Sequence, residues 1–404
     1  MDTRRTTLSR PEKYRRETVA RPECVKTVPR KFSRYGISAD DFVEALKAAA
    51  PFDFVFITSV MSYWYPGVYE AIRISKELFP VVPVVLGGIY ATLWNSHASA
   101  CSGADFIHSG PLSGNLGFIF RTFGYRMKKK NQTETPYYRQ GLYPNHPFAP
   151  LLTGTGCPYR CSYCASALLS DTFSRRSIDE VAGEIKDLYE LGVRDFAFYD
   201  DALLVNPDSH IKPILKRVID IAPGIRFHCP NGLHARFIDD ELAGLMRRSG
   251  FQTLKLSLET VDAGRQKDTG GKVSADDVSR AVEALKKHGF TKDHIGVYLM
   301  FGLPGQDIRE IREGVRFLKG LDVRINLNEF SPIPATSCWK ELLLSGIISE
   351  DIDPLQTNNT VFSWLYSGFD PEETKKPVAS HKNLHEKIIV ASCKNLFKRH
   401  VSLS

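Results

Sequence analysis

From residue 148 to residue 330, short apolar runs alternate with longer amphipathic segments. The apolar runs are rich in branched and aromatic side chains, which is typical of buried parallel strands. The amphipathic segments repeat their apolar residues at helical spacing. This alternation predicts a series of βα units, with strands at residues 148–153, 194–199, 225–229, 253–258, 295–301 and 324–330.

Three of the helices between these strands have clear start and stop signals. Ser177 and Glu180 have the three-residue spacing of a capping box. The helices predicted at 177–191, 239–249 and 274–288 are each followed by a glycine, as helix ends often are. The rhythm is that of a βα barrel, in which chemistry is expected at the carboxyl ends of the strands.

Residues 35–112 show a second, shorter alternation. A helix follows the cap at Ser38, and strands are predicted at 53–58, 81–86 and 104–107. Short connections between these elements predict a doubly wound, Rossmann-like parallel sheet. Residues 1–34 lack periodicity and are expected to be loosely ordered.

The predicted fold class is therefore α/β, built from two successive domains and a helical extension. We divide the chain into a basic arm (1–34), a Rossmann-like domain (35–112), a connector broken by prolines (113–147), a barrel (148–340) and a C-terminal helical region (341–404) with an amphipathic segment at 384–397.

Composition and charge narrow the class of protein. The chain has 404 residues, of which 43% are hydrophobic and 25% charged, as in ordinary globular proteins. The apolar stretches at 52–61 and 79–93 are too short to span a bilayer, and no apolar signal segment is visible, so a cytoplasmic protein is expected. The net charge is +7, with an excess of Lys and Arg in residues 1–34. That arm is either a solvated segment or a docking face for an acidic partner. Nucleic acid is less favoured as a partner, because no stripe of basic residues with interleaved aromatics appears.

Three cysteines, Cys157, Cys161 and Cys164, form the pattern C-x3-C-x2-C directly after the first barrel strand. Iron–sulfur cubanes are normally held by four thiolates, so three of them leave one iron open, as in catalytic metal sites. A structural zinc site would need a fourth ligand, and a disulfide cluster would need an oxidising compartment. Unconnected buried thiols would not show this spacing on a Gly/Pro loop. The default role of a small buried hydrophobe is assigned to Cys24, Cys101, Cys229, Cys338 and Cys393.

The C-x3-C-x2-C pattern with an aromatic residue before the last cysteine, Tyr163, resembles the signature of radical S-adenosylmethionine (SAM) enzymes. The resemblance covers residues 148–334 and implies a partial (β/α)6 barrel of the TIM type. It implies a [4Fe–4S] cluster that reductively cleaves SAM to a 5′-deoxyadenosyl radical, which then abstracts hydrogen from a substrate. It also implies a low-potential electron donor, ferredoxin or flavodoxin. The substrate, a small molecule or a peptide, is left open.

The resemblance also implies where SAM is bound. Asp200 or Asp201, at the end of the second strand, would bind the methionyl ammonium, and Glu259 would accept from the ribose hydroxyls. Tyr163 and the turn containing Gly302 and Pro304 would contact the adenine. Each acid taken singly is also explained as a helix N-cap. The assignment therefore rests on the order in which these acids follow the three-cysteine loop.

Residues 35–112 resemble the cobalamin-binding domain that precedes many radical SAM barrels. The likeness rests on residues 57–67 and 83–90, where Ser59, Gly87 and Gly88 would make room for the nucleotide tail of cobalamin. No histidine precedes His97, so the loop that normally supplies an axial histidine is missing and the domain looks truncated. Either cobalamin binds without that ligand and methyl transfer is favoured, or the domain has lost the cofactor.

A few further residues are candidates for contacts in the barrel. His228 and Asn231 flank the end of the third strand, where His228 is either a proton donor at the barrel mouth or a satisfied core histidine. Cys338 is expected to be structural. No catalytic residue is assigned. The rival to an enzyme is a non-catalytic iron–sulfur or corrinoid-binding module that senses redox state.

Overall fold

The structure is a computed structural model. It falls into two compact units, which are described separately: residues 1–112 with Asp353–Gln356, and residues 113–352 with 357–404. The short segment Asp353–Gln356 thus belongs to the first unit, although the sequence placed it with the C-terminal helical region. The structure describes residues 16–112, 115–126, 148–170, 172–306 and 308–367.

The first unit is built on a three-stranded parallel sheet in the order β3-β4-β5. The cap predicted at Ser38 is present as a full capping box with Asp41. The sheet is short, and its first strand is half exposed, because Phe56 points to solvent at 44% exposure. Its elements are α1 (Ala39–Ala49), β3 (Val55–Ser59), η2 (Ser62–Trp64), α2 (Tyr65–Leu78), β4 (Val84–Gly87), α3 (Gly88–Leu93), α4 (Asn95–Cys101) and β5 (Phe106–Ile107).

Residues 16–35 are ordered, contrary to the expectation of a loose arm. Strands β1 (Arg16–Thr18) and β2 (Ser33–Tyr35) pair antiparallel, around the 3-10 turn η1 (Glu23–Val25). Arg34 forms ion pairs with Glu17 at 2.6 Å and with Glu70 of α2 at 2.7 Å. These cross-strand and tertiary contacts have no helical or strand periodicity, which explains why the sequence did not reveal them. The basic residues 1–15 lie outside the described residues.

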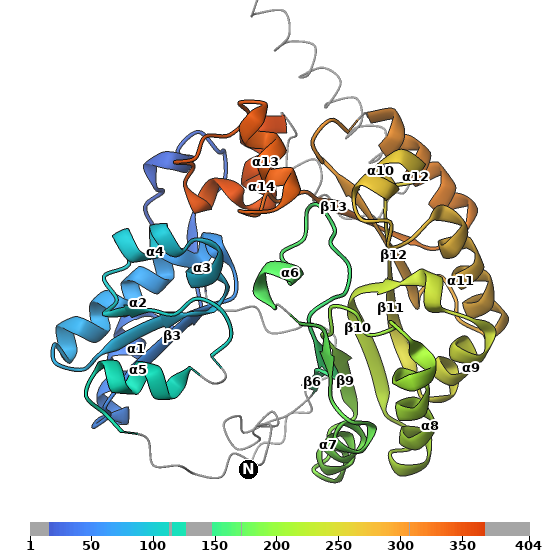
Figure 1. Cartoon of the computed structure of the whole chain (residues 1–404), viewed down its shortest axis with the longest axis horizontal. Coiled ribbons are helices and arrows are strands. Elements are labelled where there is room, and N and C mark those ends of the chain that lie inside the picture. Colours follow the sequence, from blue (N-terminus) through green and yellow to red (C-terminus); the bar gives the residue numbers. More distant parts are fainter. Residues whose placement is uncertain (1–15, 113–114, 127–147, 171, 307, 368–404) are drawn as a thin grey trace, which may run out of the picture. The chain divides into compact units, whose positions relative to one another are not determined.

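The second unit is built on a six-stranded, fully parallel sheet in the order β13-β12-β11-β10-β9-β6. Consecutive strands of the chain are neighbours in the sheet, as in a barrel that stays open between its first and last strands (Figure 1). All six predicted strands are present. Their bounds are β6 (Ala149–Leu151), β9 (Asp195–Phe198), β10 (Arg226–His234), β11 (Phe251–Glu259), β12 (Ile295–Phe301) and β13 (Arg324–Glu329).

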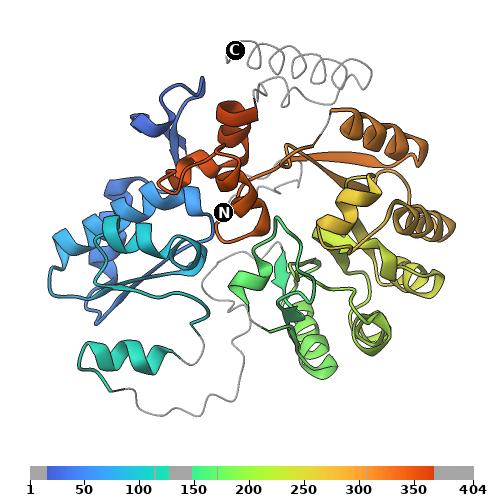
Figure 2. The same ribbon diagram turned by 45° about the horizontal axis from the view of Figure 1, so that its top comes forward.

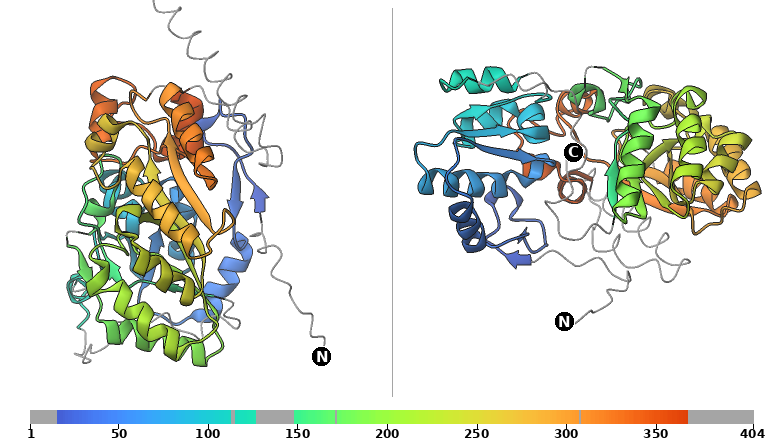
Figure 3. Two further views of the ribbon diagram at one scale, coloured as in Figure 1. Left: turned by 90° about the vertical axis from the view of Figure 1, so that its right-hand side faces the viewer. Right: turned by 90° about the horizontal axis from the view of Figure 1, so that it is seen from below.

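The longer helices of the second unit lie along one side of this sheet, and Figures 2 and 3 show the same arrangement from other directions. The capping box of Ser177 with Glu180 is confirmed, and Gly192, Gly250 and Gly289 follow their helices at positive φ. The helices along the sheet are α7 (Ile178–Glu190), α8 (Ile211–Ile221), α9 (Asp240–Arg248), α11 (Ala275–Lys287) and α12 (Ile308–Gly320).

Smaller elements of the second unit lie in the connections and after the last strand. The bounds of these elements are α5 (Leu116–Thr122), β7 (Gly154–Thr155), α6 (Ser166–Leu169), β8 (Ser174–Arg175), η3 (Pro207–Ser209), η4 (Ala235–Phe237), α10 (Ala263–Asp268), α13 (Ser337–Leu344), α14 (Asn359–Phe362) and η6 (Ser363–Ser367), while η5 (Pro354–Thr357) crosses into the first unit. The amphipathic segment 384–397 lies outside the described residues.

A buried aromatic cluster joins the middle strands to their helices. Phe198 and Phe227 have ring centroids 4.9 Å apart, and Phe227 and Phe251 are 5.2 Å apart. All three are at most 1% exposed, and each contributes about 2 kcal/mol of hydrophobic stabilisation. This core fixes the strands so that their carboxyl ends share one edge of the sheet.

The third strand differs from its predicted bounds. It continues to His234 through Pro230, Asn231 and Gly232, with a register shift between Cys229 and Leu233. The proline and glycine predicted a strand end, but the bulge accommodates both residues. In the described part of the chain, every helix is too short or too polar to cross a bilayer.

The backbone conformation at Gly88 in the first unit requires glycine, and a substitution tests this requirement. Its φ is +88°, and a Cβ would lie 2.3 Å from Thr58 Oγ1 and 2.9 Å from the Ser59 carbonyl oxygen. We expect Gly88→Ala to destabilise the first unit by about 2 kcal/mol or more, with or without cobalamin. Gly67→Ala is the matched control, because Gly67 lies in α2 with no atom near its missing Cβ and should gain up to about 1 kcal/mol. Thermal unfolding of both variants checks this; equal stability would contradict it.

Candidate functional site

The three predicted cysteines lie on one loop after β6, at the carboxyl edge of the six-stranded sheet. The loop turns tightly, with the Cys164 amide donating to the Cys161 carbonyl at 3.0 Å. The Cys164 thiol contacts the hydroxyl and amide of Ser166 at the start of α6, at 3.3 and 3.5 Å. The loop is also held from α13, where the amide of Cys338 donates to the Ser162 carbonyl at 2.9 Å. Cys338 is buried and supports the loop, in agreement with a structural role.

The three thiols are buried to different extents and are spaced more widely than the ligands of one zinc ion. Burial raises the pKa of Cys161 to about 11, and the neighbouring thiols Cys164 and Cys157 add to this effect. The three sulfur atoms do not all lie within 4.8 Å of one another. A tetrahedral zinc ion with Zn–S bonds of about 2.3 Å would hold them at about 3.8 Å.

Asp200 anchors the base of the cysteine loop. Its carboxylate accepts from the Thr153 amide at 2.9 Å and from the Thr153 hydroxyl at 2.7 Å, and it is 7% exposed. His210 Nε2 lies 2.9 Å from the same hydroxyl, and burial lowers the pKa of His210 to about 4, which keeps this imidazole neutral. Burial raises the pKa of Asp200. Asp200 is therefore occupied with holding β6 to β9.

Asp201 has the opposite environment. It is exposed, and its charge acts on the thiol of Cys157. Of the two acids that the sequence left as alternatives, Asp201 is the exposed one whose charge reaches the cysteines. Burial thus distinguishes Asp200 from Asp201, whereas their adjacent positions in the sequence do not.

Glu259 ends β11 and carries a buried ion pair that the sequence did not predict. Its backbone has a φ of +67°, a strained conformation for a residue other than glycine, and such strain is concentrated at functional sites. Lys272 Nζ lies 3.1 Å from Glu259 Oε1 and 5.5 Å from the ring centroid of Tyr163. Burial acts to lower the pKa of Lys272, but the Glu259 charge outweighs it and the pKa is raised.

Lys272 lies close to the cysteine loop. Its charge acts on Cys161 and Cys157, and Gly270, two residues earlier, packs against Cys161. Burial and the Glu259 charge raise the pKa of Tyr163 well above its usual value, and the Lys272 charge opposes them. The signal that could have identified Lys272 is its polar Gly-Gly-Lys turn, which follows so soon after a strand-end acid.

A histidine on the third strand also packs on the loop. His234 is 3% exposed, and its ring centroid lies 5.0 Å from that of Tyr159, between the first two cysteines. Burial lowers the pKa of His234 to about 3, which leaves a neutral ring under the loop. The sequence pointed to His228 instead, which bonds to Asp195 at 3.2 Å and Thr253 at 3.0 Å near the amino-terminal edge of the sheet. His228 is therefore a histidine with both ring nitrogens hydrogen-bonded, and it lies away from the barrel mouth.

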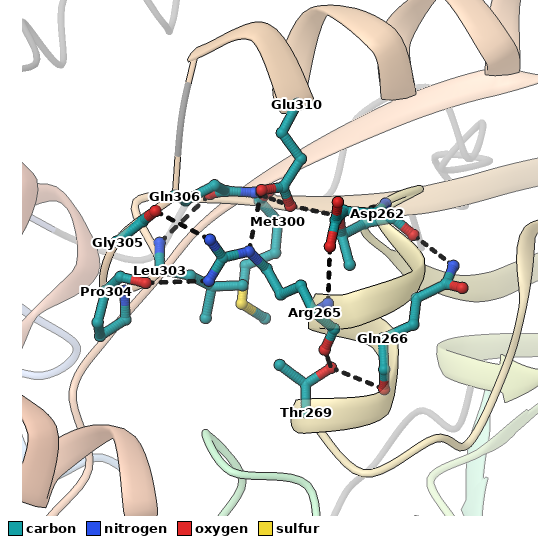
Figure 4. A network of polar contacts seen from close by, with 11 residues as sticks. Asp262, Arg265, Gln266, Thr269, Met300, Leu303, Pro304, Gly305, Gln306 and Glu310 are labelled. Carbon is teal, nitrogen blue, oxygen red and sulfur yellow. Dashed lines mark hydrogen bonds and ion pairs between the residues drawn. The ribbon is translucent and has the colours of Figure 1, made fainter.

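A network of polar contacts joins the ends of β11 and β12 (Figure 4). Arg265 of α10 donates to the carbonyls of Pro304 and Gly305 at 3.0 and 2.9 Å, and to Glu310 of α12 at 2.9 Å. Glu310 also bonds to Thr260, the residue after Glu259. A planar guanidinium that serves two carbonyls and a carboxylate at once fixes the geometry of the turn 302–305. The network thereby sets the position of this turn relative to Glu259.

Two of the residues expected to hold cobalamin are used by the first unit itself. The Ser59 hydroxyl donates to the Met61 carbonyl at 2.7 Å, and residues 59 and 88 form an isolated parallel β-bridge. The space beside Gly88 is filled by β3, and Gly87 has only His108 nearby at 3.9 Å. Ser59 and Gly88 are thus engaged in contacts within the first unit, whereas the space beside Gly87 is limited only by His108.

Comparison with known proteins agrees with this geometry. The family model described as the radical SAM superfamily matches residues 151–318, which contain the cysteine loop and the sheet from β9 to β12. Residues 151–318 are thus similar to the radical SAM superfamily over the whole stretch from the end of β6 into α12. Enzymes of this family use a [4Fe–4S] cluster and SAM.

Two relatives of this chain are described as methyltransferases. An uncharacterized methyltransferase of Pyrococcus horikoshii is 24% identical, covering 77% of this chain and 74% of the relative. Cytidylyl-2-hydroxyethylphosphonate methyltransferase of Streptomyces wedmorensis is 20% identical, covering 80% and 72%.

The fold is shared with a solved radical SAM methyltransferase, TsrM of Kitasatospora setae. With tryptophan and a SAM analogue bound, TsrM superposes with a TM-score of 0.64 at 17% identity, over 75% of this chain and 67% of TsrM. With cobalamin and a [4Fe–4S] cluster bound, the TM-score is 0.61 at 18% identity, over 75% and 66%. At this identity the comparison establishes the fold alone.

The adjacent acids Asp200 and Asp201 allow a matched pair of substitutions. Asp201→Asn should weaken SAM binding about tenfold or more, because a charge-assisted bond to the ammonium is lost, and should leave thermal stability unchanged. Asp200→Asn should cost about 1–3 kcal/mol of stability, because an amide cannot accept both Thr153 donors. Equilibrium SAM binding and thermal unfolding, measured on both reconstituted variants, check this. If Asp200→Asn alone weakens SAM binding at full stability, the assignment is reversed.

Proposed function

We propose that this protein reductively cleaves SAM at a [4Fe–4S] cluster and uses the resulting radical to take hydrogen from a substrate. The observation that carries the proposal is the shared edge of the sheet. The three thiols, the exposed carboxylate of Asp201, Glu259 and the turn 302–305 all lie at the carboxyl ends of parallel strands. That is the part of a βα barrel where active sites are built.

Each residue has a separate task in this proposal. Cys157, Cys161 and Cys164 would hold three irons, so that the fourth iron is available to the amino and carboxylate groups of SAM. Asp201 would accept from the SAM ammonium. When bound, the cluster and SAM supply the radical chemistry, with the electron delivered by ferredoxin or flavodoxin.

The nucleoside of SAM would lie between β11 and β12. Lys272 occupies Oε1 of Glu259 and leaves Oε2 without a bond among the described residues, so this oxygen can accept from the ribose. The turn with Gly302 and Pro304, held by Arg265, would support the adenine.

Removing one thiol tests the proposal. Cys164→Ala should lose the charge-transfer absorbance near 400 nm of the reconstituted protein and reduce 5′-deoxyadenosine formation with dithionite and SAM by about 10³-fold or more, because the cube has too few ligands. Cys101→Ala is the control, since Cys101 is an exposed thiol of the first unit. A wild-type cluster that binds no SAM and yields no 5′-deoxyadenosine would favour the redox-sensor alternative.

Cobalamin-dependent methyl transfer is a second candidate, supported by the methyltransferase relatives and by TsrM. One feature of the first unit favours it. The segment after β3 exposes large apolar side chains at the carboxyl edge of its sheet, with Val60 at 59%, Met61 at 39% and Trp64 at 57% exposure. In open α/β sheets ligands bind at this edge, so we infer that the face of a flat macrocycle contacts this loop.

Tryptophan emission makes this second candidate testable. Hydroxocobalamin added to the reconstituted protein should quench Trp64 fluorescence saturably, and Trp64→Ala should weaken cobalamin binding about tenfold. Substitution of Phe118, an equally exposed aromatic of the second unit, is the control. If cobalamin does not bind wild-type protein, radical chemistry without methyl transfer is the remaining function.

A further inference from the structure

The open face of the six-stranded sheet is polar, which is unusual for a barrel. Along each strand, alternate residues point to opposite faces, and Phe227, Leu254 and Val297 point into the core with the helices. The residues between them therefore point to the other face. Barrel interiors are normally filled by branched apolar side chains. Here that face carries Asp195, Arg226, His228, Lys255, Asn326 and Asn328.

Lys255 lies across the middle of this face. Its Nζ donates to Asn326 Oδ1 of β13 at 3.0 Å, passing over β12 at Gly296. A Cβ at position 296 would lie 2.6 Å from both Lys255 Nζ and Asn326 Oδ1. Only glycine at this position allows the ammonium to be placed here. The lysine is thus held by the sheet and is not a freely mobile surface side chain.

The charge of Lys255 is not compensated within the described residues. Arg226 is paired with Asp195, and Arg324, in register with Gly296, is paired with Asp293. Lys255 has no carboxylate within ion-pair distance there. Asn326 accepts from Lys255, so its amide NH₂ remains available as a donor, and Asn328 is exposed two residues further along the same strand. A fixed cation beside two amide groups is the donor set that an oxyanion requires.

We propose that Lys255, with Asn326 and Asn328, binds a carboxylate, phosphate or phosphonate group of the substrate. This inference rests on the proposed function, because it places the substrate on the face that leads to the cysteine loop. Lys255 and Glu259 are four residues apart on β11, which corresponds to about 13 Å along a strand. The substrate would therefore be a small anionic molecule whose reacting carbon lies about that far from its oxyanion.

The experiment uses the full chain reconstituted with its cluster and two probe anions, methylphosphonate and acetate. Saturation-transfer NMR on the methyl protons reports the binding of both probes and distinguishes phosphorus oxyanions from carboxylates. We expect saturable binding of at least one probe to wild-type protein. Lys255→Met should weaken it tenfold or more, whereas Lys255→Arg should retain it. Lys292→Met, which removes an exposed lysine paired with Asp322, should leave it unchanged.

Absence of saturable binding to wild-type protein, or equal binding to Lys255→Met, would overturn the inference. Should Lys255→Met lose its cluster absorbance or unfold early, Asn326→Asp gives the same test, because a carboxylate beside Lys255 would neutralise it and expel the anion. Formation of 5′-deoxyadenosine without substrate should be unaffected by Lys255→Met. If wild-type protein forms no 5′-deoxyadenosine, the proposed function is rejected. If wild-type protein forms 5′-deoxyadenosine but binds neither anion, only this inference is rejected.

Discussion

The candidate site depends on one constraint, the parallel direction of six neighbouring strands. Because β6, β9, β11 and β12 run the same way, their carboxyl ends bring together a cysteine loop, two acids and a glycine turn that are up to about 150 residues apart in sequence. The phenylalanine cluster between sheet and helices keeps these ends level. The chemistry assigned to the thiols then follows from their place at that edge.

Two kinds of polar contact keep this edge in shape. Asp200 and Thr153 join the first two strands at the base of the cysteine loop, and the Thr153 hydroxyl also contacts His210. Lys272 forms an ion pair with Glu259, and Arg265 donates a hydrogen bond to the carbonyl of Pro304 in the neighbouring turn. Buried charges are costly unless paired and hydrogen-bonded, and here each one is positioned by at least one partner. Preorganised ligand groups of this kind can bind SAM without reorganising the strand ends.

The sequence predicts what is encoded locally. The cysteines lie within eight residues, the capping box of Ser177 with Glu180 is a short pattern, and the second, fourth and fifth strands are followed by a recognisable acid or glycine. It could not predict the partner of Glu259, because Lys272 lies thirteen residues later in a turn that looks solvent-exposed. It could not separate Asp200 from Asp201 either, because neighbouring residues share one pattern and differ only in the tertiary contact with Thr153. The hairpin at 16–35 was missed for the same reason, since its pairing is between residues distant in sequence.

The central claim is that three thiolates leave one iron for the amino acid end of SAM. Electron–nuclear double resonance on the reduced, reconstituted protein tests it most directly, with SAM labelled by ¹⁷O in its carboxylate and ¹⁵N in its amino group. The account predicts strong hyperfine coupling of both labels to the cluster, as expected for direct ligands of one iron. Coupling no stronger than that of a remote molecule would contradict it, as would a Mössbauer spectrum in which all four irons have sulfur-only coordination after SAM is added.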